Sequence, residues 1–143
     1  MQFTSAVITA VLAITVTALP QAPGQGAPNA GAIAALVPDF GVQAGQGNDG
    51  AGNCVTPVAP AKIPCTCPPP RDQYLSQLTA AVQAGNTFGL PAPFPTGSDT
   101  ASQTIRLQTM LSVMQNINGA KGKGCPAIST TFKQTLDGLT RAA

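Results

Sequence analysis

The sequence predicts an all-α protein: a small three-helix bundle closed by disulfides, preceded by a disordered arm rich in Gly, Pro and Gln and by a Pro-rich strap. Three observations lead to this fold class. Apolar residues recur with helical spacing only after residue 71, the chain has four cysteines, and the composition before residue 54 is of low complexity. With no Trp and one Tyr, the core gains little burial energy, and disulfides would supply the missing stability.

Residues 1–18, MQFTSAVITAVLAITVTA, predict a cleavable signal peptide. Their uncharged apolar stretch ends in Val16-Thr17-Ala18, the small-residue pattern that signal peptidase accepts. A transmembrane anchor is the alternative, but the stretch is shorter than the ~20 apolar residues that a span needs. The C-terminal residues lack the hydrophobic tail of a GPI signal. We therefore expect a secreted chain without a membrane anchor.

Residues 19–53 are expected to form a flexible arm. Gly, Ala, Pro, Gln and Asn dominate them, and two similar pieces recur at 24–32 and 45–53. Such a composition cannot bury enough apolar surface to offset the chain entropy lost on folding. One apolar island, 33–40, interrupts the arm. A short turn of helix docked on the domain is one alternative for it, and an apolar spot in a mobile arm is the other; we expect the island to be mobile and to dock only transiently.

Residues 54–143 are expected to form the disulfide-linked helical domain, which begins with the strap. The segment 54–70 holds three cysteines and six prolines. Proline at this density excludes a regular helix and an interior strand. The expected structure is an extended, polyproline-like strap fixed by its cysteines.

Three helices should follow the strap. The first is expected over 72–84, with Asp72 as its N-cap and Gly85 at its end. The second is expected over 100–117, where Thr100 and Gln103 form a capping-box pair. The third should begin at Cys125-Pro126, with proline in the first helical position.

Two loops connect these helices. The loop over 87–98 is rich in Pro and Gly, and we expect its apolar side chains to pack onto the helices as a lid. These side chains are Phe88, Leu90 and Phe94. The second loop, GAKGKG at 119–124, lacks the glycine spacing and the Lys-Ser/Thr ending of a P-loop, so it is interpreted as an exposed turn.

The cysteines are the candidate site residues, and they are expected to form two disulfides. A bond between Cys65 and Cys67 would close a ring across one residue, against the ~5.5 Å Cα separation that a disulfide prefers. Two pairings remain: Cys54–Cys65 with Cys67–Cys125, or Cys54–Cys67 with Cys65–Cys125. A zinc site would require paired C-x-x-C motifs or added histidines, and the chain has a C-x-C and no His.

The composition argues against an enzyme. Without His or Glu, no Ser-His-Asp or Cys-His arrangement is available, and the five Asp residues are expected at helix caps, at a helix end or in the arm. We expect no catalytic residue, no cofactor and no metal. Residues 62–143 hold all seven Lys and Arg against three Asp, a net charge of +4 that is far below the basic density of a nucleic-acid binder.

Two motifs carry a resemblance to a known family. Cys67-Pro-Pro-Pro-Arg-Asp-Gln-Tyr is followed, after two expected helices, by Asn118-Gly-Ala-Lys-Gly-Lys-Gly-Cys125-Pro-Ala-Ile-Ser-Thr-Thr-Phe132. Over about residues 54–143 the chain resembles small secreted fungal proteins of the conidial cell wall protein A type. The resemblance implies a place on the spore surface and a role in masking it from host recognition.

The leading hypothesis is therefore a secreted structural protein of a fungal cell wall or spore surface, in contact with wall polysaccharide, other wall proteins or host immune components. The alternative is a diffusible effector or small-ligand binding protein. In that case the apolar stripe of the second helix, together with Phe88 and Phe94, would line a lipid cavity.

Overall fold

The computed structural model of the protein describes residues 26–56, 58 and 61–143, so the expected signal peptide lies outside the described part. Within that part, four α-helices, a short 3-10 helix and two antiparallel two-stranded sheets follow one another along the chain. The predicted all-α three-helix bundle is therefore wrong. One helix and both sheets form in segments whose Gly and Pro content predicts loops or extended chain.

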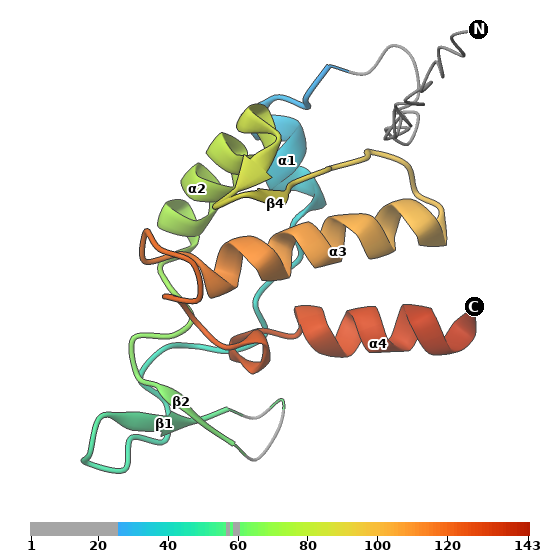
Figure 1. Ribbon diagram of the computed structural model, residues 1–143. Coiled ribbons are helices and arrows are strands. Elements are labelled where there is room, and N and C mark those ends of the chain that lie inside the picture. Colours follow the sequence, from blue (N-terminus) through green and yellow to red (C-terminus); the bar gives the residue numbers. More distant parts are fainter. Residues whose placement is uncertain (1–25, 57, 59–60) are drawn as a thin grey trace, which may run out of the picture.

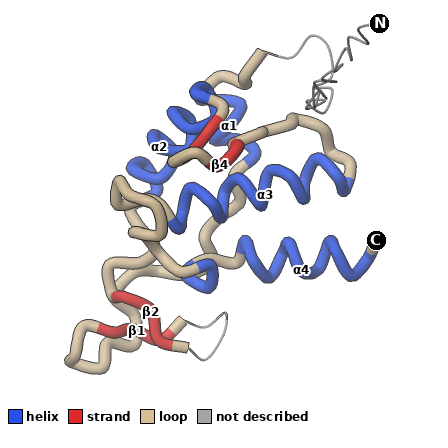
Figure 2. Tube along the Cα trace, viewed as in Figure 1, coloured by secondary structure: helices blue, strands red, loops and turns tan. Residues whose placement is uncertain are grey.

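The helices form a stack (Figure 1). Helix α1 (Ala30–Leu36) packs on α2 (Arg71–Ala84), α2 packs on α3 (Thr100–Gln115), and α3 packs on α4 (Phe132–Ala142). Figure 2 shows the two hairpins well separated in the view. Strands β1 and β2 project below the helices, whereas β3 and β4 lie alongside α2.

Helix α1 overturns the expectation of a disordered arm across residues 26–53. Asn29 caps the helix by accepting a hydrogen bond from the backbone N–H of Ala32 at 2.9 Å. Ile33 is completely buried, and Val37 and Val42 also belong to the core. The island is short, but its apolar side chains enter the same core as α2, and this burial holds the segment in place.

Arg71, the first residue of α2, fastens the chain that leaves α1. Its guanidinium donates to the carbonyl oxygens of Val37 at 2.8 Å and Pro38 at 3.0 Å. It also lies 5.6 Å from the centre of the Phe40 ring, within cation–π range. Arg71, which is distant in the sequence, therefore holds residues 37–40, and the composition of these residues does not predict the contact.

Phe40 completes a three-ring aromatic cluster with Tyr74 of α2 and Phe132 of α4. The Phe40 ring meets Tyr74 edge-on at 5.3 Å and Phe132 at 5.8 Å between ring centres. The buried Tyr74 hydroxyl donates to the carbonyl oxygen of Met110 in α3 at 2.9 Å. Burial raises the pKa of Tyr74 well above its usual value, so the phenol keeps this proton. The cluster, with this hydrogen bond, joins the segment after α1 to α2, α3 and α4.

The Pro-rich segment forms a hairpin in place of the expected polyproline-like strap. Strand β1 (Asn53–Val55) pairs with β2 (Lys62–Pro64) in antiparallel register. The argument from proline excluded an interior strand, but a two-stranded sheet has only edges, where proline is tolerated. Pro64 sits at the end of the ladder, opposite Asn53.

Asp49 organises the turn that leads into β1. Its carboxylate accepts hydrogen bonds from the backbone N–H groups of Ala51 at 2.9 Å and Asn53 at 3.2 Å, and from the Lys62 ammonium at 2.7 Å. The bond with Lys62 is the largest cause that lowers the pKa of Asp49, to about 2. The second low-complexity repeat is thus an ordered turn held by one carboxylate.

Helix starts differ from those expected. Pro70 precedes α2 as its N-cap, and Asp72 lies in the first turn, where the helix dipole favours a negative charge. Gly85 ends α2 in the left-handed conformation, as expected. Asp99 caps α3, as expected of this aspartate, and its carboxylate accepts from the Ser102 N–H at 2.9 Å; the capping box predicted for Thr100 and Gln103 is wrong, because Thr100 is already the first helical residue.

The last helix begins later than expected. Cys125-Pro126 leads into the 3-10 helix η1 (Ala127–Ser129), and α4 starts only at Phe132. Between them Thr130 is extended, with φ −143° and ψ 169°, which interrupts the helical path. The predicted start was wrong because Pro126 is the N-cap of η1, with ψ 154°, and is not the first residue of α4.

Candidate functional site

The four cysteines form two disulfides, so that prediction is confirmed. Cys54 bonds to Cys65 and closes the β1–β2 hairpin, and Cys67 bonds to Cys125 and joins the start of α2 to the start of η1. This is the first of the two pairings left open by the sequence. On the chain-entropy model the bridges contribute about 3 and about 4 kcal/mol, because they close loops with separations of 11 and 58 residues.

The glycine and lysine loop after α3 is a rigid turn. The buried side chain of Asn116 accepts from the Gly122 N–H at 2.7 Å, and Ala120 and Lys123 form a β-bridge. Gly124 lies so close to the end of α3 that an added Cβ would stand 2.5 Å from the Met114 carbonyl oxygen. Gly124 therefore serves close packing, whereas Gly119 and Gly122 adopt a positive φ, and the Lys121 and Lys123 side chains are exposed.

The carboxylates are dispersed over the fold. Asp49 and Asp99 stabilise a turn and a helix start, and bonds from Ser102 lower the pKa of Asp99. Asp137 pairs with Lys133 at 2.7 Å along α4, and Asp39 lies 3.9 Å from Arg71. No three potential metal ligands of the His, Cys, Asp or Glu type come together within the described ranges.

The loop expected to form a lid packs into the core only through its second half, because Phe88 and Leu90 in its first half are exposed. Ala92 and Phe94 are buried, and α3 fixes the chain beyond them. Arg106 donates to the carbonyl oxygens of Pro95 at 2.7 Å and Gly97 at 2.6 Å. Burial lowers the pKa of Arg106, while the charge of Asp99 raises it. Most of the apolar stripe of α3 lies in the core with Phe94, whereas Ile105 is 36 % exposed.

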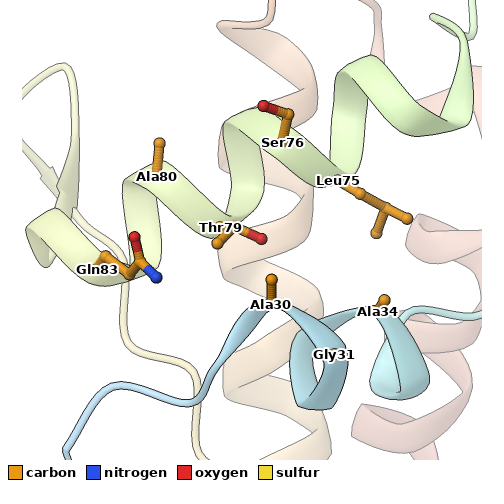
Figure 3. A pocket seen from close by; sticks show the side chains of 8 residues that line it. All are labelled: Ala30, Gly31, Ala34, Leu75, Ser76, Thr79, Ala80 and Gln83. Carbon is orange, nitrogen blue, oxygen red and sulfur yellow. The ribbon is translucent and has the colours of Figure 1, made fainter.

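Two hollows stand out on the surface of the described part. The larger, of about 600 Å³, is an open groove between α1 and α2. Figure 3 shows its small lining side chains, with Ala30 and Ala34 on α1 directed toward Thr79 and Leu75 on α2. The groove carries no charge, and its polar groups are the hydroxyls and amide of Ser76, Thr79 and Gln83.

The smaller hollow, of about 270 Å³, lies under the β3–β4 hairpin and is called the hairpin groove here. Strand β3 (Asn86–Thr87) pairs with β4 (Leu90–Pro91) across a loop of two residues, Phe88 and Gly89. The hairpin groove is lined by Gln77, Ala80 and Ala81 of α2, Val113 of α3, and Asn86, Thr87 and Phe88 of the hairpin.

Phe88 is the unusual residue of the hairpin groove. Its φ is +49° and that of Gly89 is +80°, the pattern of a type I′ turn that normally takes Asn, Asp or Gly at both positions. The left-handed conformation costs a residue with a Cβ about 1–2 kcal/mol. The ring nevertheless remains 46 % exposed, so the strain is not offset by burial in the core.

This surface is not predicted by the sequence. Phe88 and Phe94 are expected together in a lid, although Phe94 enters the core and Phe88 does not. One signal was available in the sequence: residues 73–98 contain no charged side chain at all. An exposed helix ordinarily carries charges on its solvent face, so this run predicts a surface of unusual chemistry.

Comparison with known protein families, with curated proteins and with solved structures finds no match for this chain. None of the helices in the described ranges has the length and apolar character required to cross a bilayer.

Proposed function

We propose that this chain is an exported, non-enzymatic structural protein of a fungal cell wall or spore surface, retained by contacts with wall polymers. The observation that carries the proposal is the pair of disulfides. They leave no free cysteine among the described residues; one closes the β1–β2 hairpin, and the other links the segment before α2 to the segment before η1. Disulfides of this structural kind persist in oxidising compartments and are rare in the cytosol.

The chemistry of the chain supports a structural role over a catalytic one. The sequence has no His and no Glu, and the Asp side chains are used in turns, helix starts and ion pairs. The buried polar side chains of Tyr74 and Arg106 hold neighbouring segments through backbone carbonyl groups. Each of these groups stabilises the fold, which suits a protein whose function is to persist in a wall.

Wall fractionation tests the proposal. A tagged full-length chain is expressed in a filamentous fungus, and isolated walls are extracted in turn with salt, hot detergent and reductant. We expect release in hot detergent, because the retention is non-covalent, and a mature N-terminus at Leu19. Recovery from the culture medium alone would contradict wall retention. Recovery from the cytosol with reduced cysteines would contradict export.

Deletion of the gene tests the masking role that the family resemblance implies. Spores without the protein should expose more wall polysaccharide to a polysaccharide-binding probe than wild-type spores do. Equal labelling of the two spore types would contradict masking while leaving wall retention in place.

A further inference from the structure

We infer, on the basis of the proposed wall association, that the hairpin groove binds a neutral polysaccharide, with the Phe88 ring as its stacking platform. The neutral face is defined here as the residues lining the hairpin groove and the α1–α2 groove. Ala80 belongs to both hollows, so the two are neighbours across α2.

The position of Phe88 is the first observation. A strained left-handed aromatic residue at the tip of a two-residue hairpin is explained neither by turn chemistry, which favours Asn or Gly, nor by the core, because the ring is exposed. Strain of this kind concentrates at functional positions. What the strain achieves here is the presentation of an aromatic ring beside an open groove.

The chemistry of the neutral face is the second observation. None of the side chains lining either groove is charged. Within the described part of the chain, no hydrogen bond uses the side chains of Ser76, Gln77, Thr79 or Gln83. They form a surface of hydroxyl and amide groups, able to donate and to accept, with no hydrogen-bond partner among the described residues.

A sugar polymer matches this combination. The C–H face of a pyranose ring packs on an aromatic ring, and its hydroxyls exchange hydrogen bonds with amides and hydroxyls. At about 270 Å³ the hairpin groove is slightly smaller than the roughly 300–1,000 Å³ of pockets that enclose a drug-sized ligand. It would therefore hold one sugar ring, while the other rings of the polysaccharide lie over the rest of the neutral face.

The surface charge selects a neutral polymer over an anionic one. Lys121 and Lys123 are exposed, but neither lines the neutral face. An anionic chain lying in the hairpin groove would lose solvation without gaining a cation there. A second copy of the protein is the competing occupant, and it would leave polysaccharide binding unaffected by changes at Phe88.

Binding to insoluble polysaccharide tests the inference with purified full-length protein. The probes are β-1,3-glucan particles and chitin beads as neutral polymers, and dextran sulfate as an anionic one. Phe88→Asn places a favoured residue in the turn, so its melting temperature should equal or exceed that of the wild type. Its affinity for the neutral polymer should fall about tenfold or more, the loss typical of removing an aromatic stacking partner.

Leu90→Ser is the matched control, because Leu90 is 37 % exposed on the same hairpin but lines neither groove. It should leave binding unchanged, whereas Gln77→Ala should weaken it. Equal binding by wild type and Phe88→Asn, binding to dextran sulfate alone, or no binding would each overturn the inference. A change from dimer to monomer in Phe88→Asn, with polysaccharide binding intact, would also overturn it.

The wall fractionation separates this inference from the proposed function. Wild-type protein that is retained in walls but does not bind either neutral polymer would overturn the site and leave the function standing. Wild-type protein that binds a neutral polymer through Phe88 but is found only in the medium would support the site and contradict wall retention.

Discussion

Replacing Ile33 with Ala should destabilise the whole domain, because α1 is part of its core. Ile33 is completely buried and belongs to the same core as the buried residues of α2, on which α1 packs. The change removes about three buried methyl or methylene groups at about 0.8 kcal/mol each, and the cavity left behind adds to this loss. We expect the free energy of unfolding to fall by about 3 kcal/mol.

Urea unfolding followed by far-ultraviolet circular dichroism measures this loss. With a slope of about 1.5 kcal/mol per molar urea, the midpoint should fall by about 2 M. Ala35→Ser is the matched control on the exposed side of α1, and it should change the free energy of unfolding by no more than about 0.5 kcal/mol. A midpoint for Ile33→Ala within that same margin would refute the assignment of α1 to the cooperative core.

Three further predictions concern single residues. Arg106→Met should lower the free energy of unfolding by about 2 kcal/mol, because two backbone carbonyls lose their donor, whereas Arg141→Met should be near neutral in the same thermal melt. Asp49 has a folded pKa of about 2, below its usual 3.8. Its contribution to the free energy of unfolding is therefore complete above about pH 4 and is lost as the pH falls toward 2. Asp49→Asn should flatten that part of a plot of urea midpoint against pH, and an unchanged slope would contradict this role. Gly124→Ala should lower the free energy of unfolding by about 1–3 kcal/mol, because the added Cβ meets backbone atoms. Gly138→Ala on α4 is the control, and it should raise the free energy of unfolding by about 0.5–1 kcal/mol because the space around it is open. A higher urea midpoint for Gly124→Ala than for Gly138→Ala would contradict this packing.

The sequence predicted the parts of the fold that depend on local rules. The helical spacing around Tyr74 and the glycine at 85 placed α2 to within a residue, and the cysteine spacing left only two pairings, one of which the structure has. These features follow from periodicity, capping and ring geometry, each of which acts over a few residues.

The missed parts depend on distant partners. Ile33 lies in a segment whose composition resembles a flexible linker, and it is held because Arg71 and the aromatic cluster bind the chain after α1. The β1–β2 hairpin was missed because its prolines were weighed against interior strands alone. The Phe88 turn was missed because Phe-Gly is not a sequence favoured for a type I′ hairpin.

We infer that the disulfide-closed domain binds a neutral polysaccharide on its neutral face. Titration of isotope-labelled protein with a soluble β-1,3-glucan or chitin oligosaccharide, followed by amide chemical shifts, tests it most directly. The largest shifts should cluster at Gln77, Ala80, Asn86 and Phe88, which line the hairpin groove. Shifts confined to Lys121 and Lys123, or no shifts with either oligosaccharide, would contradict it.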